Sequence, residues 1–176
     1  VFGLAILILL IFLLLVINAA ISDLLYFIIP NLIPITLVIL FFFTVIIFRW
    51  DIQLVLSNLL TSFVMLVICF ILFNRRFIGG GDAKFISAVS VWSGLDTLYE
   101  FVLITAICGG LLALFFLAFK IHSISSRLKG IKLLNQFLKS ENKVPYGIAI
   151  AVGTLATFYN FTIFQYIISS YTLVPV

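Results

Sequence analysis

Charged residues are scarce in this chain of 176 residues. Asp, Glu, Lys and Arg make up only 9% of it, whereas 65% is hydrophobic. Soluble globular domains carry about 25% charged residues, so this shortage excludes that class. The formal net charge of +4 is too small to indicate nucleic-acid binding. The length fits one domain, and we expect residues 1–176 to form a single membrane-embedded domain.

Cysteine and histidine are almost absent. Cys69 and Cys108 lie inside apolar runs without CxxC spacing, so we interpret them as small buried hydrophobes rather than a disulfide or a zinc site. The single histidine, His122, has no evident partner, and no serine or cysteine falls in a nucleophile motif. The sequence therefore predicts no cofactor and no metal, and leaves carboxylates as the plausible acid–base groups.

Long apolar stretches are what the sequence has in place of charge. They predict an all-α polytopic membrane protein with about six transmembrane helices. We expect these helices at residues 2–21, 32–48, 52–73, 83–95, 98–119 and 146–168. No basic segment precedes the first stretch, which is long enough to span, so we interpret it as a membrane helix and not as a cleavable signal peptide.

The basic residues set the predicted topology. As a helix the fourth stretch covers only about 20 Å of a hydrocarbon core of ~30 Å, so it is either re-entrant or a short crossing. If it crosses, every Lys and Arg except Arg49 falls on one side, in residues 75–84 and 120–143. The positive-inside rule makes that side cytoplasmic, which places both termini outside the cytoplasm and predicts the inner (cytoplasmic) membrane as the location. We expect the basic segment 120–143 to lie against anionic membrane lipid.

Two aspartates share the predicted cytoplasmic boundary. Asp23 ends the first apolar stretch, and Asp82 follows three glycines, which indicate a backbone that bends sharply or approaches something closely. A carboxylate at the edge of lipid is expensive and is a functional-site hypothesis by default. Two carboxylates that share one proton can hydrolyse a peptide bond, one as the base toward water and the other as the acid toward the substrate. We therefore predict that Asp23 and Asp82 form an aspartic protease dyad.

Other interpretations of these aspartates stay open at this point. Each one could be a helix N-cap or an interfacial anchor. The pair could hold a divalent cation, but hard cations usually take six or more oxygen ligands and the sequence offers few. A transporter would place acids near the middle of its spans, and no predicted span has one there.

Three motifs resemble those of one known family. Residues 79–84, Gly-Gly-Gly-Asp-Ala-Lys, resemble the GxGD signature of the type IV prepilin peptidases, which are membrane-embedded aspartic proteases. Asp23 followed by Ile29-Pro30-Asn31 resembles that family's first aspartate motif, although residues 24–28 are apolar where the family usually has basic or polar residues. Residues 144–149 resemble the opening of the last span in the small Tad/Flp-pilus members. The three motifs occur in the expected order over essentially the whole chain.

The resemblance implies a function and a set of site residues. Such peptidases remove the short, positively charged leader from prepilins or pseudopilins at the cytoplasmic face, before the hydrophobic segment of the pilin. Asp23 and Asp82 would be the catalytic pair. The residues that would shape or support the site around them are Gly79, Gly81, Lys84, Pro30 and Asn31. The larger bacterial members add a cytoplasmic domain with a cysteine motif and also methylate the pilin. This sequence has no such motif, so the resemblance does not imply methylation.

Two other functions are less consistent with the sequence than the peptidase. A non-catalytic membrane scaffold of a pilus or secretion system would be expected to lose at least one aspartate, and both are present. A GxGD protease of the presenilin or signal-peptide-peptidase type would carry Tyr before its partner aspartate, whereas Ser22 precedes Asp23. The prepilin peptidase is the favoured function.

Overall fold

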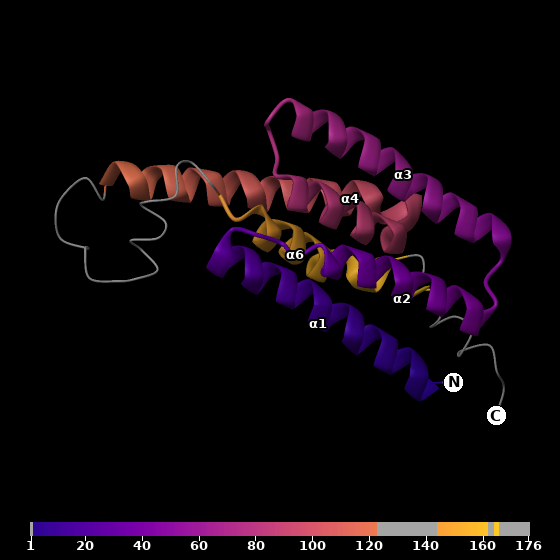
Figure 1. The fold of residues 1–176 in the computed structure, drawn as a ribbon. Coiled ribbons are helices and arrows are strands. Elements are labelled where there is room, and N and C mark those ends of the chain that lie inside the picture. The colour runs from indigo at the N-terminus through magenta and orange to yellow at the C-terminus, as the bar shows by residue number, and fades with distance from the viewer. Residues whose placement is uncertain (1, 123–143, 162–163, 166–176) are drawn as a thin grey trace.

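The computed structural model describes residues 2–122, 144–161 and 164–165, and these parts of the chain are helical, as predicted. The helices are α1 (Phe2–Tyr26), α2 (Leu32–Phe48), α3 (Ile52–Asn74), α4 (Gly80–His122), α6 (Tyr146–Thr157) and the 3₁₀ turn η1 (Phe158–Asn160) (Figure 1). The prediction of residues 32–48 matches α2 at both ends, and α3 ends one residue later than predicted. Of the predicted basic segment 120–143, residues 123–143 lie outside the described residues.

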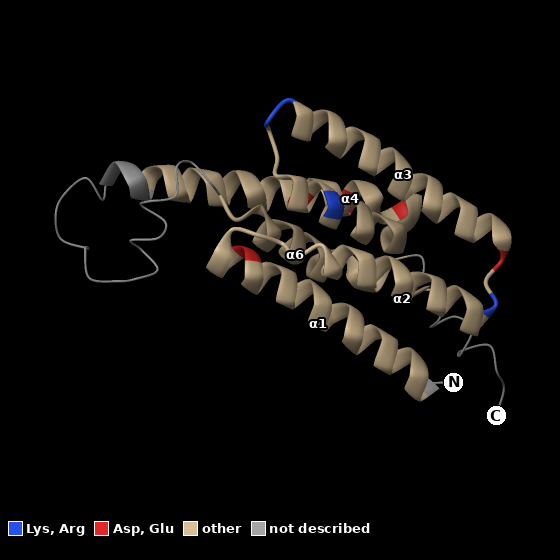
Figure 2. Ribbon diagram, viewed as in Figure 1, with Lys and Arg blue, Asp and Glu red and all other residues tan. Residues whose placement is uncertain are grey.

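Within the described residues, three helical stretches are long and apolar enough to cross a membrane, namely Gly3–Tyr26, Ile52–Asn74 and Gly80–Ala118, the last of which is interrupted at Gly94. The α2 helix is shorter and also apolar. Figure 2 shows that α2 and α3 carry no charged residue along their length. Large apolar side chains such as Leu32 and Ile46 are exposed, whereas Thr44 and Ser90 are buried between helices. This inside-out pattern is typical of helices that face lipid. Six crossings and the placement of both termini stay predictions.

The first helix ends later than predicted. Asp23 was expected to end it, but α1 continues to Tyr26, so Asp23 lies within its last turn. The helix stops at Phe27, which has a left-handed backbone (φ 54°) and donates its N–H to the Asp23 carbonyl. The Ser22 hydroxyl donates to the carbonyl of Ile28 at 2.8 Å and folds the next residues back against the helix.

The glycine run is not the bend that connects α3 to α4. The chain turns earlier, at Arg76, where a left-handed residue (φ 62°) and a bond from Phe77 N–H to the Leu72 carbonyl close the end of α3. Gly80 already begins α4, three residues before the predicted start. The sequence misled here because a left-handed residue is usually glycine, and in this protein an arginine takes that conformation.

The predicted fourth and fifth stretches are the two arms of α4. They meet at Gly94, whose backbone (φ 67°, ψ −178°) is not helical and suits glycine in particular. The arms run antiparallel, because Asp82 in the first lines the same cavity as Tyr146 at the start of α6, and Gly109 in the second lies against the ring of that tyrosine. The predicted connection at residues 96–97 is therefore helical, and one residue reverses the chain (Figure 1).

The last helix is shorter than predicted. Residues 146–168 were expected to form one span, but α6 ends at Thr157 and η1 follows. Phe161 leaves helical geometry (φ −57°, ψ 131°) and is fully buried. The Thr97 hydroxyl, on the second arm of α4, donates to the Asn160 carbonyl at 2.8 Å. The break thus directs Phe161 and the nearby Phe164 into the core.

The core is an aromatic cluster near the Gly94 reversal. Trp92 and Phe12 are fully buried with ring centroids 4.8 Å apart, and Phe41 approaches the same tryptophan at 6.0 Å. The Trp92 indole N–H donates to the Leu37 carbonyl at 3.1 Å, which links α4 to α2. Trp92 lies ten residues beyond Asp82, or about 15 Å along a helix, so this core and Asp82 occupy opposite ends of the first arm.

Candidate active site

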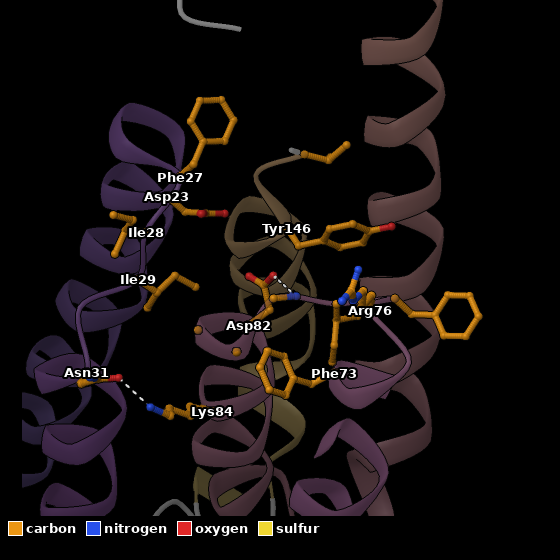
Figure 3. Close-up of a pocket in the computed structure, with 16 residues that line it drawn as sticks. Asp23, Phe27, Ile28, Ile29, Asn31, Phe73, Arg76, Asp82, Lys84 and Tyr146 are labelled. Atoms are coloured by element: carbon orange, nitrogen blue, oxygen red, sulfur yellow. Dashed lines mark hydrogen bonds between the residues drawn. The ribbon is translucent and has the colours of Figure 1, made fainter. Parts of the chain in front are cut away.

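Asp23 and Asp82, far apart in the sequence, line the same cavity. It has a volume of about 680 Å³ and lies where four segments meet: the end of α1, the loop after it, the α3–α4 connection with the start of α4, and the start of α6. Figure 3 shows both carboxylates directed into this space from different helices. Tertiary packing therefore brings together the two residues that the sequence singled out.

Asp23 is the more enclosed of the two, with 5% of its surface exposed. Its Oδ2 accepts a hydrogen bond from the backbone N–H of Gly147 at 2.6 Å. Gly147 is in the first turn of α6, where backbone N–H groups have no partner within the helix and the helix dipole favours negative charge. A buried carboxylate in this position has a specific donor, although it comes from a distant part of the chain.

Asp82 is half-buried and belongs to the first turn of α4. Its Oδ2 accepts the N–H of Gly79 at 3.2 Å (Figure 3), which is the bond that the third helical residue makes back to the N-cap in a capping box. A Cβ at Gly79 would lie 2.8 Å from that same oxygen. Of the two explanations for the glycines, close approach is the one observed, since Gly94 is the glycine with positive φ among the described residues.

The two aspartate motifs contact each other beside the cavity. Gly81 lies against Ile29 of the first motif, where a Cβ would be 3.4 Å from the isoleucine Cβ. The Lys84 ammonium donates to the Asn31 side-chain oxygen at 2.9 Å, across 53 positions of sequence. Gly79, Gly81, Asn31 and Lys84 all line the cavity, and their part in a catalytic site stays a prediction.

Pro30 is the exception among the predicted site residues. It is exposed and does not line the cavity. Its carbonyl accepts the N–H of Ile33 at 3.0 Å, which places Pro30 at the turn that leads into α2. Pro30 therefore lies in the turn before α2, next to Asn31, and not in the cavity wall.

Several lining residues escaped sequence reasoning. Arg76 and Tyr146 line the cavity. Gly147 does not line it but donates its backbone N–H to Asp23, which does. An apolar wall comes from residues on both sides of the cavity, which are Phe27, Ile28, Phe73 and Phe77. Residues 144–149 resemble the opening of the last span in the family, but nothing in that segment predicts a bond from Gly147 to Asp23, 124 positions away.

The arrangement offers acid–base chemistry. Two carboxylates, a cation on either side (Arg76 and Lys84) and an apolar wall surround a space of a size typical for ligand sites. Asp23 and Asp82 are the carboxylates that line this cavity, and no group of three or more His, Cys, Asp or Glu residues that could hold a metal gathers within the described residues. Cys69 is buried and Cys108 half-buried, and both are free thiols.

Comparison with known proteins identifies the family of the chain. No curated protein and no solved structure matches the chain. The family described as the type IV leader peptidase family matches residues 8–114, which include α2, α3, both aspartates and the Gly94 reversal. The apolar helices and this match together indicate a membrane protein with a leader peptidase role. The chain belongs to the type IV leader peptidase family.

Proposed function

We propose that this chain is a membrane aspartic endopeptidase that removes the basic leader from prepilins or pseudopilins, with Asp23 and Asp82 as its catalytic dyad. The observation that carries the proposal is the shared cavity. Asp23 and Asp82 are far apart in the sequence, and both carboxylates line it. The family match supports a leader peptidase in general, and the dyad gives it a mechanism.

The proposed mechanism uses one water and one shared proton. An ionised carboxylate takes a proton from the water as the water attacks the scissile carbonyl. The protonated carboxylate donates its proton to the carbonyl oxygen, which gives a tetrahedral gem-diol. As the gem-diol collapses, the C–N bond breaks, the carboxylate that took the water proton donates it to the leaving amine, and the other carboxylate takes a proton back from a gem-diol hydroxyl. Asp23 and Asp82 would exchange these roles over one turnover, so both are needed. Gly79 would hold Asp82 in place through its N–H.

The cavity walls suggest how a substrate is received. Phe27, Ile28 and Phe77 offer apolar surface to the residues beside the scissile bond. The leader is basic, whereas Arg76 and Lys84 are cations on the cavity wall. Since like charges repel, we propose that the basic part of the leader stays outside the cavity, and that the junction between leader and apolar segment enters it.

The location and domain extent follow the same proposal. Arg75, Arg76 and Lys84 lie at the cavity end of the molecule, so the positive-inside rule supports a site that faces the cytoplasm, in the inner membrane, for a six-span chain. Buried residues from α1, α2, α3, α4 and α6 share one core, which supports a single peptidase domain over residues 1–176. We propose a small Tad/Flp-type enzyme.

The test is leader cleavage of a co-expressed prepilin by wild type, Asp23→Asn and Asp82→Asn. Each substitution keeps the shape of the side chain and removes its acid–base function, and we expect cleavage to fall by on the order of 10²–10⁴-fold. Asp51→Asn is the matched control, because Asp51 is exposed and makes no capping bond with its side chain. Protein abundance in the membrane is measured alongside.

The outcomes separate the proposed function from its alternative. Loss of cleavage in both site variants at normal abundance, with Asp51→Asn active, supports the dyad. Cleavage that survives in either site variant breaks the shared-proton mechanism. Wild type that cleaves no prepilin but is required for assembly of the pilus would favour a membrane scaffold.

A further inference from the structure

We infer that Gly147 is a positioning residue of the peptidase, which fixes the Asp23 carboxylate through its backbone N–H and leaves room for it by having no side chain. The inference rests on the proposed function for its catalytic meaning. Gly147 lies outside residues 8–114, so the family match does not include it. With Gly147, the start of α6 becomes a third element of the site, beside the two segments that carry the aspartates.

The contact between Gly147 and Asp23 is close and buried. The N–H donates to Oδ2 at 2.6 Å, and both residues are buried. A Cβ at position 147 would lie 2.8 Å from the Asp23 Cβ, 2.9 Å from Oδ2 and 3.1 Å from Cγ. The nearest of these atoms is attached to the backbone of α1, so it cannot swing away as the end of a flexible side chain could. Any residue but glycine would displace the carboxylate.

The start of α6 is itself held in place by the second arm of α4. A Cβ at Gly109 would lie 2.7 Å from a ring carbon of Tyr146, so the tyrosine next to Gly147 packs directly on the glycine surface. Farther along α6, a Cβ at Gly153 would lie against the Thr105 side chain and 3.1 Å from the Thr105 backbone nitrogen. Glycines at helix contacts allow backbones to approach closely. Gly109 makes such a contact, whereas a Cβ at the neighbouring Gly110 would have no atom within 4 Å.

A purely structural role would use the same bond. The N-cap residue of α6, Pro145, provides no side-chain cap, so the Asp23 carboxylate also satisfies an N–H at the start of this helix. If capping were the whole role, loss of the bond would lower the stability and abundance of the protein and leave the kcat of the folded fraction unchanged. A positioning role lowers kcat itself. The measurement must therefore separate turnover from the amount of folded enzyme.

The first experiment compares Gly147→Ala with Gly110→Ala in the full chain, purified in membranes or detergent and assayed on a prepilin. We expect Gly147→Ala to lower kcat per folded enzyme by on the order of 100-fold, since a misplacement of about 1 Å in a catalytic group has that effect, with a smaller change in KM. Gly110→Ala, with no atom within 4 Å of its new Cβ, keeps the kcat of wild type. A wild-type kcat in folded Gly147→Ala would overturn the inference.

A second variant removes the donor without adding an atom. Cell-free translation with glycolic acid at position 147 replaces the amide by an ester and deletes the N–H. We expect kcat per folded enzyme to fall again, whereas the same ester at position 110, which also removes one backbone donor from a helix, leaves kcat as in wild type. An unchanged kcat in the 147 ester overturns the role of the N–H, even if Gly147→Ala fails to fold.

A spectroscopic measurement keeps this inference distinct from the proposed function. The amide proton of Gly147, labelled selectively with ¹⁵N, is followed by NMR in wild type and in Asp23→Ala. Loss of a short bond to a carboxylate should move the resonance upfield. An unmoved resonance overturns the contact whatever the enzyme cleaves. A moved resonance in a protein whose Asp23→Asn variant still cleaves would support the contact and break the dyad alone.

Discussion

The two carboxylates of the site are held in the same way from very different distances. Asp82 accepts the N–H of Gly79, three positions before it, and Asp23 accepts the N–H of Gly147, 124 positions after it. The first bond forms as soon as the first turn of α4 does, because donor and acceptor belong to the same turn. The second requires α1 and α6 to be packed together. One half of the site is a local motif, and the other half is a product of the tertiary fold.

The surroundings of the two bonds differ as well. Gly79 is exposed and Asp82 half-buried, whereas Gly147 and Asp23 are both buried. A disturbance at the local bond can therefore relax toward solvent, and one at the distant bond meets close packing on all sides. We expect the distant anchor to tolerate less change, and the following substitutions test this difference.

The largest expected effect comes from lengthening each carboxylate by one methylene. In Asp23→Glu the longer side chain has no room beside Gly147, and we expect cleavage to fall by on the order of 100-fold or more. Asp82 is only half-buried, so a glutamate at position 82 has more room, and Asp82→Glu should keep more activity than Asp23→Glu. Rates of prepilin cleavage at equal enzyme abundance provide the measurement. Equal losses, or a greater loss in Asp82→Glu, would contradict the comparison.

Alanine at two neighbouring glycines tests the local anchor. In Gly79→Ala the new Cβ would lie 2.8 Å from the Asp82 Oδ2, so the carboxylate must move, and we expect about a tenfold loss of kcat, less than at Gly147. In Gly80→Ala the nearest atom, at 3.3 Å, belongs to the Phe73 ring, which is the movable end of a side chain. This variant should stay close to wild type. A loss in Gly80→Ala as large as in Gly79→Ala would point to general distortion of the α4 start.

The Lys84–Asn31 contact links the two aspartate motifs and should matter less than either anchor. Both residues are exposed, and exposed polar pairs contribute about 1 kcal/mol or less. We expect Lys84→Met and Asn31→Ala each to lower cleavage by a few-fold at most, which is the scale of such a free energy. A double-mutant cycle measures their coupling. Additive effects would show that the hydrogen bond does not link the motifs energetically.

The smallest expected effect lies in the connection before Gly79. Arg76 has φ 62° and Arg75 has φ −80°, so glycine relieves an unfavourable backbone at the first position and only loosens the chain at the second. Arg76→Gly should raise the free energy of unfolding by about 1 kcal/mol, and Arg75→Gly should lower it by a similar amount or less. Thermal unfolding in detergent measures both. The same sign for the two variants would exclude strain at Arg76.

Local features were the ones that the sequence predicted well. The turn at Pro30 and Asn31 and the polar residues after Phe48 delimit α2, and both ends of that helix were predicted. Gly79 and Asp82 belong to one short motif, and their bond lies within it. These features depend on neighbouring residues alone, which is the information that a single sequence contains.

The errors arose where distant packing overrides a local preference. Asp23 was expected to end α1, but the helix continues to Tyr26 and places the aspartate beside α6. The reversal between the arms of α4 takes a single residue, Gly94, so the connection predicted at residues 96–97 was placed two residues too late. The role of Gly147 could not be read from its neighbours, because it depends on a helix at the other end of the chain.

The space around Gly79 and Gly147 has a consequence for natural variation. Every missense change of a glycine codon adds at least a Cβ, and at these two codons that atom would lie within 2.9 Å of a carboxylate atom. Neither codon therefore has a conservative neighbour. In a saturation library selected for leader processing, position 147 should keep glycine alone and position 79 should strongly prefer it, whereas Gly3 and Gly110, whose Cβ positions have no atom within 4 Å, should accept many residues.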